Sequence, residues 1–185
     1  GQSRIALSNI GTPGSRVPMT SSAPASLVFM GVAGSGKSTL GAAVAARLGR
    51  VWLEGDDFHG EANRRKMAAG QPLTDADRAA WLAALCHQLR HQPQGAMAAC
   101  SALKRAYRDQ LRQASPGLRF AFLDISKDEA RRRVQTRGGH FFSASLMDSQ
   151  FDTLESPVGE ADVLRLDALA PLSRLQTQIC DWLKS

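Results

Sequence analysis

The segment Gly31-Val-Ala-Gly-Ser-Gly-Lys37-Ser38 carries the residue types that bind nucleotide phosphates. It fits the pattern G-x-x-x-x-G-K-[ST] throughout and stands between an apolar run and a stretch with helical signals. The glycines let successive N–H groups point at phosphate oxygens, and the following helix adds partial positive charge. Lys37 is expected to reach the β- and γ-phosphates of ATP as a catalytic residue, and Ser38 to ligate Mg²⁺. The predicted nucleotide-binding residues of this loop are Gly31, Gly34, Ser35, Gly36, Lys37, Ser38 and Thr39.

Three carboxylates and an imidazole follow the next short apolar run, within residues 54–59. If that run is a parallel strand, these groups lie at its carboxyl end, beside the phosphate loop. Phosphoryl transfer to a hydroxyl needs a group that accepts the hydroxyl proton, and carboxylates that hold Mg²⁺, often through water. We predict Asp56 as the base for the acceptor hydroxyl and Glu54 in the water shell of the metal. Asp57 is equally well explained as a residue that caps the next helix.

Basic residues follow at positions suited to an acidic substrate. One of Arg64 and Arg65 is a candidate clamp for a substrate carboxylate, because adjacent helical residues diverge by about 100° and at most one can face the site. Lys104 and Arg108 share a helix face at i and i+4 and are candidates for contacts with a polyol or a carboxylate.

A later basic helix carries Arg133 and Arg137 on one face and runs into the pair Gly138-Gly139. An arginine that a hinged segment brings over the phosphates would offset the charge that develops during transfer. Arg133 is therefore a candidate catalytic residue, and both arginines are candidates for ATP binding.

Other acids fit structural roles better. Asp75 and Asp77 follow Thr74 at the start of a predicted helix, where capping explains them better than catalysis. Asp124 ends an apolar run in the manner of a Walker B aspartate. We do not expect it to hold the metal, since residues 54–57 already supply carboxylates near that position.

Strand and helix signals alternate along the chain. Apolar runs predict strands at 26–30, 51–53, 96–100, 118–125 and 162–166. Helices are predicted at 37–48, 60–69, after Thr74, at 104–114, after Ser126 to about 137, and after Pro171. This alternation indicates an α/β fold in which helices cover both faces of a parallel sheet.

We expect residues 26–185 to form one domain. Residues 1–25 are rich in Ser, Gly, Pro and Thr and lack apolar periodicity. We predict that they are a disordered extension, or a cloning remnant ahead of Met19.

Length and charge narrow the class of protein. A chain of 185 residues suits one domain and leaves no room for a motor, and no N-K-x-D guanine motif occurs. The net charge of +6 comes from scattered arginines, which favours an enzyme for ATP and an anionic acceptor over a nucleic-acid partner. Three cysteines without ligand spacing argue against disulfides and zinc and favour a reducing cytoplasm. No apolar run approaches the roughly 18 residues of a membrane span.

Three blocks of the chain, in their order and spacing, resemble the gluconokinase family: GDDFHGEANRRKMAAGQPLTDADR, ACSALKRAYRDQLR, and GHFF with SQFDTLE. The resemblance runs from about Leu27 to the C-terminus and lies within the shikimate-kinase-like P-loop kinases. It implies phosphorylation of D-gluconate by ATP and Mg²⁺ to 6-phospho-D-gluconate. It also implies a three-layer α/β/α fold with a five-stranded parallel sheet, a helical lid over about residues 133–155, and a homodimer. By position, the resemblance places Arg133 and Arg137 towards ATP, and around the substrate Asp56, His59, Arg64, Lys104, Arg108 and Gln150.

Other functions remain open at this point. A kinase of the same fold that acts on shikimate or another aldonate fits the same residues. A module that binds ATP without catalysis is a second alternative, although Lys37, Ser38 and Asp56 argue against it. A basic nucleic-acid-binding protein would show tight and steeply salt-dependent binding to DNA or RNA.

Overall fold

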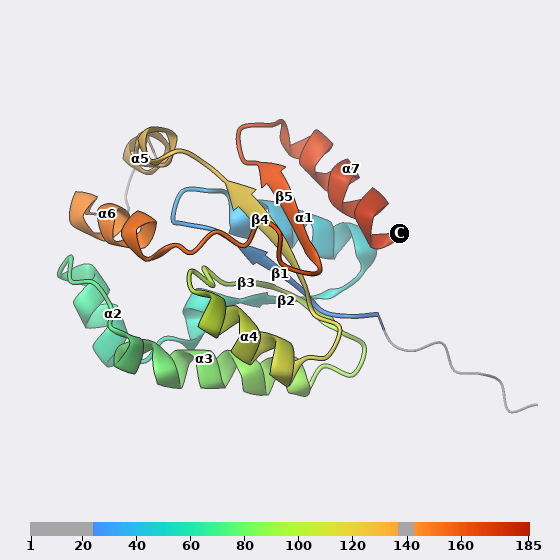
Figure 1. Cartoon of the computed structure of the whole chain (residues 1–185), viewed down its shortest axis with the longest axis horizontal. Coiled ribbons are helices and arrows are strands. Elements are labelled where there is room, and N and C mark those ends of the chain that lie inside the picture. The colour runs from blue at the N-terminus through green and yellow to red at the C-terminus, as the bar shows by residue number, and fades with distance from the viewer. Residues whose placement is uncertain (1–23, 137–142) are drawn as a thin grey trace, which may run out of the picture.

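The strands form a single parallel sheet. The computed structural model describes residues 24–136 and 143–185. The strands lie side by side in the order β2-β3-β1-β4-β5, and all neighbouring pairs are parallel (Figure 1). The predicted strands are confirmed, with ends that differ by one residue: β1 (Leu27–Met30), β2 (Val51–Glu54), β3 (Ala96–Ala99), β4 (Arg119–Asp124) and β5 (Val163–Asp167).

The helix ends follow local sequence signals. Gly49 takes the left-handed conformation (φ 63°) directly after α1, as predicted. Thr74 and Asp77 form a capping box at the start of α3, in which each side chain accepts the backbone N–H of the other residue. The described helices are α1 (Lys37–Leu48), α2 (Glu61–Ala68), α3 (Asp75–Arg90), α4 (Arg105–Ala114), α5 (Lys127–Thr136), α6 (Ala144–Thr153) and α7 (Leu172–Leu183), with a 3₁₀ turn, η1 (Gly55–Phe58).

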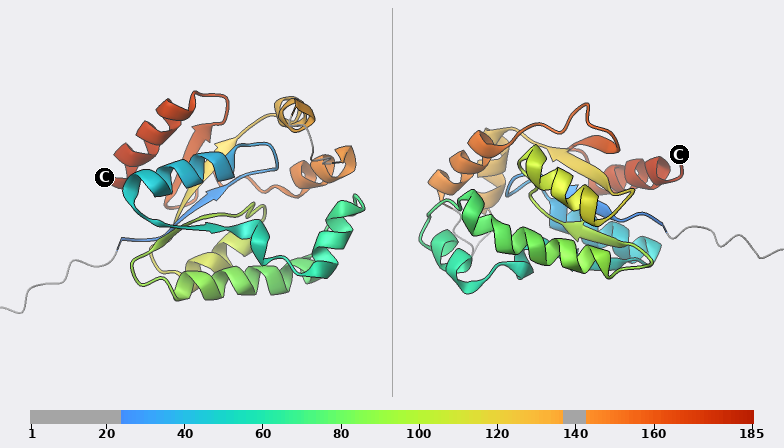
Figure 2. Two further views of the ribbon diagram at one scale, coloured as in Figure 1. Left: turned by 180° about the vertical axis from the view of Figure 1, so that it is seen from behind. Right: turned by 60° about the horizontal axis from the view of Figure 1, so that its bottom comes forward.

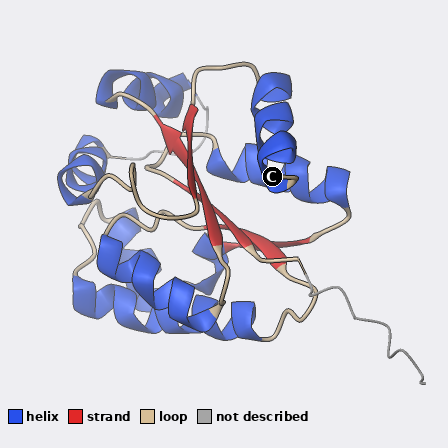
Figure 3. Cartoon of the chain, turned by 45° about the vertical axis from the view of Figure 1, so that its right-hand side comes forward, coloured by secondary structure: helices blue, strands red, loops and turns tan. Residues whose placement is uncertain are grey.

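Helices cover both faces of the sheet and create two cores. Helices α1 and α7 lie on one face, and α3 and α4 lie on the other (Figure 3). Successive side chains of a strand point to opposite faces. Accordingly, Leu27 and Phe29 of β1 join the core with α1 and α7, whereas Val28 and Met30 join the core with α3 and α4. A central strand covered on both sides therefore needs the uninterrupted apolar run that β1 has.

The remaining helices gather beyond the carboxyl edge of the sheet. Helices α2, α5 and α6 all lie on that side of the molecule (Figure 2). Arg131 of α5 pairs with Asp148 of α6 across 2.5 Å. The Ser145 hydroxyl of α6 donates to the Gly70 carbonyl after α2 across 3.2 Å. These contacts hold α6, which lies within the segment 133–155 where the family resemblance implies a lid.

Two predictions fall on residues that the structure does not describe. The predicted extension lies almost wholly within residues 1–23, and the ATP contact predicted for Arg137 lies within 137–142. Within residues 24–136 and 143–185, no helix has the length and apolar character to cross a membrane.

Candidate active site

The phosphate loop lies between the end of β1 and the start of α1, at the centre of the sheet. Gly34 and Gly36 have φ values of 79° and 90°, a backbone conformation that residues other than glycine rarely adopt. Gly36 precedes the first residue of α1 and has no side chain to cap it. The N–H groups of the first helical turn therefore face the loop without a side-chain partner from Gly36, as an anion site requires.

Ser38 and Glu54 come together beside this loop. The Ser38 hydroxyl donates to Glu54 Oε1 across 2.8 Å, which joins the start of α1 to the end of β2. Among the described residues, no three His, Cys, Asp or Glu side chains gather to hold a metal. Mg²⁺ needs no such cage, because it keeps several waters and binds few protein oxygens together with substrate phosphates. A hydroxyl next to a carboxylate fits that donor set.

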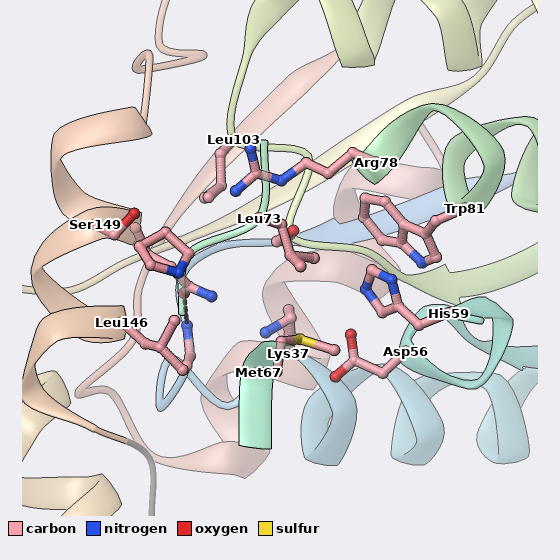
Figure 4. A pocket seen from close by; sticks show the side chains of 14 residues that line it. Lys37, Asp56, His59, Met67, Leu73, Arg78, Trp81, Leu103, Leu146 and Ser149 are labelled. Carbon is pink, nitrogen blue, oxygen red and sulfur yellow. Dashed lines mark hydrogen bonds between the residues drawn. The ribbon is translucent and has the colours of Figure 1, made fainter. Parts of the chain in front are cut away.

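A cavity of about 100 Å³ opens next to the loop, and Figure 4 shows the side chains around it. Lys37 and Asp56 point into it from the loop and from η1. Segments between α2 and α3, between β3 and α4, and along α6 complete the walls. The lining residues are Ala33, Lys37, Asp56, His59, Met67, Pro72, Leu73, Arg78, Trp81, Ser101, Leu103, Leu146, Ser149 and Gln150.

Close packing of β2 against β3 sets the position of Asp56. A Cβ atom on Gly55 would lie 2.0 Å from the Ala99 carbonyl oxygen, so only glycine allows this approach. The Trp81 indole N–H donates to the Gly55 carbonyl across 2.8 Å and holds the turn against α3. Asp56 therefore projects from a turn that is fixed on two sides.

His59 lies at the other end of η1, stacked on Trp81. The two rings are 4.5 Å apart at their centroids and inclined by 12°. Burial lowers the pKa of His59 below its ordinary value, and the cations of Arg64 and Arg78 act in the same direction, whereas Asp56 opposes them. A buried imidazole with a lowered pKa is neutral near pH 7.

Three of the predicted substrate contacts do not reach this cavity. Arg64 donates to the carbonyls of His59 (3.0 Å) and Asp57 (3.1 Å), so its guanidinium holds the backbone of η1. Lys104 pairs with Asp75 across 2.9 Å. The prediction for Arg108 is wrong in this structure, because its side chain is fully buried and bonded to Glu160.

Arg78 is a charged residue of the cavity that the sequence analysis did not assign to the site. It extends from α3 over the cavity towards Leu103 (Figure 4). Its Nη1 atom donates to the Tyr107 hydroxyl across 3.2 Å, and that hydroxyl donates to Asp75. Within the described part of the chain, no carboxylate forms an ion pair with Arg78. A sequence signal existed, since Arg78 stands three residues before Trp81 and thus on the same helix face.

Gln150 reaches the cavity from α6 and contacts the phosphate loop. Its Oε1 atom accepts the Ala33 N–H across 2.7 Å. The predicted substrate residue Gln150 therefore lies where the loop and the acceptor cavity meet.

A second cavity, of about 200 Å³, borders the phosphate loop at Ser35, Gly36 and Thr39. Apolar residues after β5 and at the start of α7 form another part of its wall, including Ala170 and Leu172. Arg133 also lines it and donates to the Gly34, Ser35 and Ala168 carbonyls, the last across 2.6 Å. Arg133 thus joins α5 to the phosphate loop and to the segment that follows β5.

Asp124 pairs with an arginine and does not contact Ser38 or Glu54. Arg165 Nε donates to its carboxylate across 2.9 Å.

These features together define a P-loop kinase of small molecules. The phosphate loop lies between the two cavities. The first cavity holds a carboxylate, an imidazole and an arginine that pairs with no carboxylate of the described residues, whereas the second cavity is largely apolar. Such an arrangement suits a nucleoside on one side and a polar acceptor on the other.

Comparison with known proteins identifies the family within the P-loop kinases. Residues 27–157 match the AAA domain family. Gluconokinase from Gluconobacter oxydans is 51% identical over 147 residues, which span 77% of this chain and 82% of that protein. Thermoresistant gluconokinase from Escherichia coli is 42% identical over 149 residues, spanning 78% and 85%. The chain belongs to the gluconokinase family.

Solved structures agree with this assignment. A gluconokinase from Sinorhizobium meliloti superposes with a TM-score of 0.81 at 44% identity, over 87% of this chain and 92% of that one. Shikimate kinase from Acinetobacter baumannii superposes with a TM-score of 0.60 at 14% identity, over 88% and 94%. The second likeness shows a shared fold alone.

Proposed function

We propose that this protein transfers the γ-phosphate of ATP to the 6-hydroxyl of D-gluconate. Membership of the gluconokinase family supports the substrate. The observation that carries the chemistry is that Lys37 and Asp56, from different elements, line the same cavity (Figure 4). A phosphate-binding cation and a carboxylate base must both face the acceptor hydroxyl in such a reaction.

Each residue then has a distinct part. The loop N–H groups and Lys37 bind and orient the phosphates, and Arg133 offsets charge near the loop. Asp56 accepts the proton of the 6-hydroxyl as that oxygen attacks the γ-phosphorus and the bond to ADP breaks. Ser38 and Glu54 would hold Mg²⁺, Glu54 through water; the ion neutralises phosphate charge when bound. The second cavity would take the nucleoside of ATP.

Arg78 supports an anionic acceptor. A cation that lines the cavity without a carboxylate partner is costly to leave unpaired, so the ligand is expected to supply the anion. We assign the substrate carboxylate to Arg78 in place of Arg64, which the backbone of η1 already occupies. Arg78→Met should raise the KM for gluconate roughly 10-fold to 100-fold. Arg65→Met removes the same charge from an exposed part of α2 that does not line the cavity, and is the matched control.

The substrate is tested by measuring ADP release with Mg²⁺ across gluconate, other aldonates, shikimate, glycerate and a nucleoside monophosphate. Turnover with gluconate alone supports the proposal. Turnover with a different acid would preserve the mechanism and reject the substrate. ATP binding without turnover on any acceptor would favour the non-catalytic alternative.

The base is tested by Asp56→Asn. We expect kcat to fall by about 10²- to 10⁴-fold, the usual contribution of general base catalysis. Asp57→Asn changes the neighbouring carboxylate, which does not line the cavity, and should retain kcat. Full turnover by Asp56→Asn would reject this role for Asp56.

The cellular setting is also part of the proposal. We infer a cytoplasmic homodimer without a nucleic-acid or membrane partner, on the basis of the family resemblance and the scattered charge. Light scattering of the purified protein measures the assembly. A monomer at micromolar concentration would reject the dimer and leave the kinase assignment intact.

A further inference from the structure

His59 has one ring nitrogen whose partner fixes its hydrogen-bonding role. The Asn63 Nδ2 atom lies 3.2 Å from His59 Nδ1 and 2.8 Å from the Asp77 carbonyl oxygen. A backbone carbonyl only accepts, so the Asn63 atom that contacts it must be the amide nitrogen. The same nitrogen has a second hydrogen, which points to His59 Nδ1. That ring nitrogen must therefore accept and cannot carry a proton.

We propose that Asn63 is a positioning residue that locks His59 in the neutral Nε2–H tautomer, so that the ring offers an N–H donor to the acceptor substrate. His59 lines the cavity, and Nε2 has no partner among the described residues. Asn63 and His59 are each only 8% exposed, and stacking on Trp81 holds the plane of the ring. The ring can neither rotate nor change tautomer without breaking these contacts.

Burial and two neighbouring arginines favour the same state, whereas Asp56 opposes it. The groups that act on His59 are Asp56 of η1, Arg64 of α2 and Arg78 of α3. In an imidazolium, the Nδ1–H of His59 would face the N–H of Asn63, so that two donors would meet. The imidazolium would also add a cation near two arginines. Burial also lowers the pKa of His59, so the neutral ring persists at physiological pH.

This assignment gives different roles to Asp56 of η1 and to His59, which follows η1. A ring with protonated Nε2 and occupied Nδ1 cannot remove a proton, so His59 cannot replace Asp56 as the base. His59 can instead donate to a hydroxyl oxygen of the substrate. This contact would hold the substrate so that its 6-hydroxyl lies next to Asp56. The substrate part of this inference rests on the proposed acceptor role of the cavity, whereas the tautomer does not.

The tautomer is measured directly by ¹⁵N NMR of the full-length protein with labelled histidine. His59→Gln identifies the His59 signals among those of the four histidines. We expect a neutral ring with protonated Nε2 from about pH 7 to 8, above the ordinary histidine pKa of 6.5. A protonated Nδ1, or an imidazolium in this range, would overturn the proposal whether or not gluconate is the substrate.

Enzyme kinetics test whether the hydrogen bond between Asn63 and His59 affects substrate binding. Asn63→Leu should raise the KM for gluconate about tenfold, the effect of one misplaced hydrogen bond, with a smaller change in kcat. His59→Gln keeps an N–H donor near the Nε2 position without a ring to orient. Adding Asn63→Leu to His59→Gln should therefore leave KM unchanged. An equal rise in both backgrounds would show that Asn63 acts by packing alone. If Asn63→Leu fails to fold, the NMR result on the unaltered protein decides the tautomer.

Discussion

Arg108 and Glu160 form a bidentate ion pair away from solvent. The Arg108 Nη2 atom lies 2.7 Å from Glu160 Oε2, and Nε lies 3.1 Å from Oε1. Two further donors of the guanidinium reach the carbonyls of Ala102 (2.7 Å) and Glu155 (2.9 Å). The pair thus fastens α4 to the loop before it, which borders the acceptor cavity, and to the chain that follows α6.

Arg108→Met is expected to destabilise the protein strongly. It leaves the Glu160 carboxylate buried without its main partner, a change that costs about 3–5 kcal/mol of unfolding free energy. Thermal and urea unfolding measure the loss. Arg105→Met removes a neighbouring arginine whose ion pair with Asp109 is exposed, and should cost at most about 1 kcal/mol. An unchanged midpoint for Arg108→Met with a raised KM for gluconate would instead restore Arg108 as a substrate residue.

The same pair makes stability depend on pH. Burial alone would raise the pKa of Glu160, but hydrogen bonds and charge from Arg108 and Arg112 outweigh it and hold the pKa below the ordinary 4.5. The folded state therefore binds this proton less readily than the unfolded chain. The stabilisation is complete above pH 4.5 and is lost as the pH falls through the lower folded-state pKa. As the pH is lowered below 4.5, the unfolding midpoint of the native protein should fall more steeply than that of Glu160→Gln.

Gly34→Ala tests the backbone of the phosphate loop. A Cβ atom at Gly34 would lie 2.9 Å from the Ala130 carbonyl oxygen of α5, and φ is 79°. The left-handed conformation alone costs a non-glycine residue roughly 1–2 kcal/mol, and the clash adds to it. We expect weaker ATP binding by calorimetry. Gly60→Ala is the matched control, because its Cβ atom would meet nothing within 4 Å. Equal ATP affinity in both variants would contradict this account.

The sequence revealed chemistry that is contiguous along the chain. The phosphate loop and the Asp56 turn each fit within a few residues, and the strand before each turn places it at the carboxyl edge of the sheet. The alternation of strands and helices was equally legible, because a parallel sheet buried on both faces needs uninterrupted apolar runs.

Contacts between distant segments stayed hidden. Arg78 and Arg108 are both helical arginines near acidic residues, and only the position of Glu160 decides which one is withdrawn from the cavity. The second cavity includes Ala168, Ala170 and Leu172, residue types that carry no chemical signal. Helix α6 was predicted only as part of a lid, although Ser143 caps its start locally by accepting the Leu146 N–H.

The proposed Mg²⁺ ligands, Ser38 and Glu54, predict a changed Mg²⁺ requirement. Glu54→Gln should raise the Mg²⁺ concentration for half-maximal turnover about 10–100-fold, as the loss of an outer-shell ligand does in other metal sites. Asp124→Asn makes the same change of carboxylate to amide at a residue bound to Arg165, and should leave the requirement unchanged. The reverse order of effects would identify Asp124 as the metal carboxylate. Mg²⁺ titrations at saturating ATP and gluconate distinguish the two outcomes.

Gln150 connects the lid helix to the site of transfer, and its amide orientation predicts its effect. The Oε1 atom is held by the Ala33 N–H, so the Nε2 group is left to donate into the cavity. Gln150→Glu keeps an acceptor for Ala33 but replaces that donor with a carboxylate oxygen beside the phosphoryl group. We expect kcat to fall about 10-fold to 100-fold, with a smaller change in ATP affinity. Gln135→Glu makes the same substitution on an exposed part of α5 and should leave kcat unchanged. If both variants retain full turnover, α6 closes the cavity without taking part in the transfer.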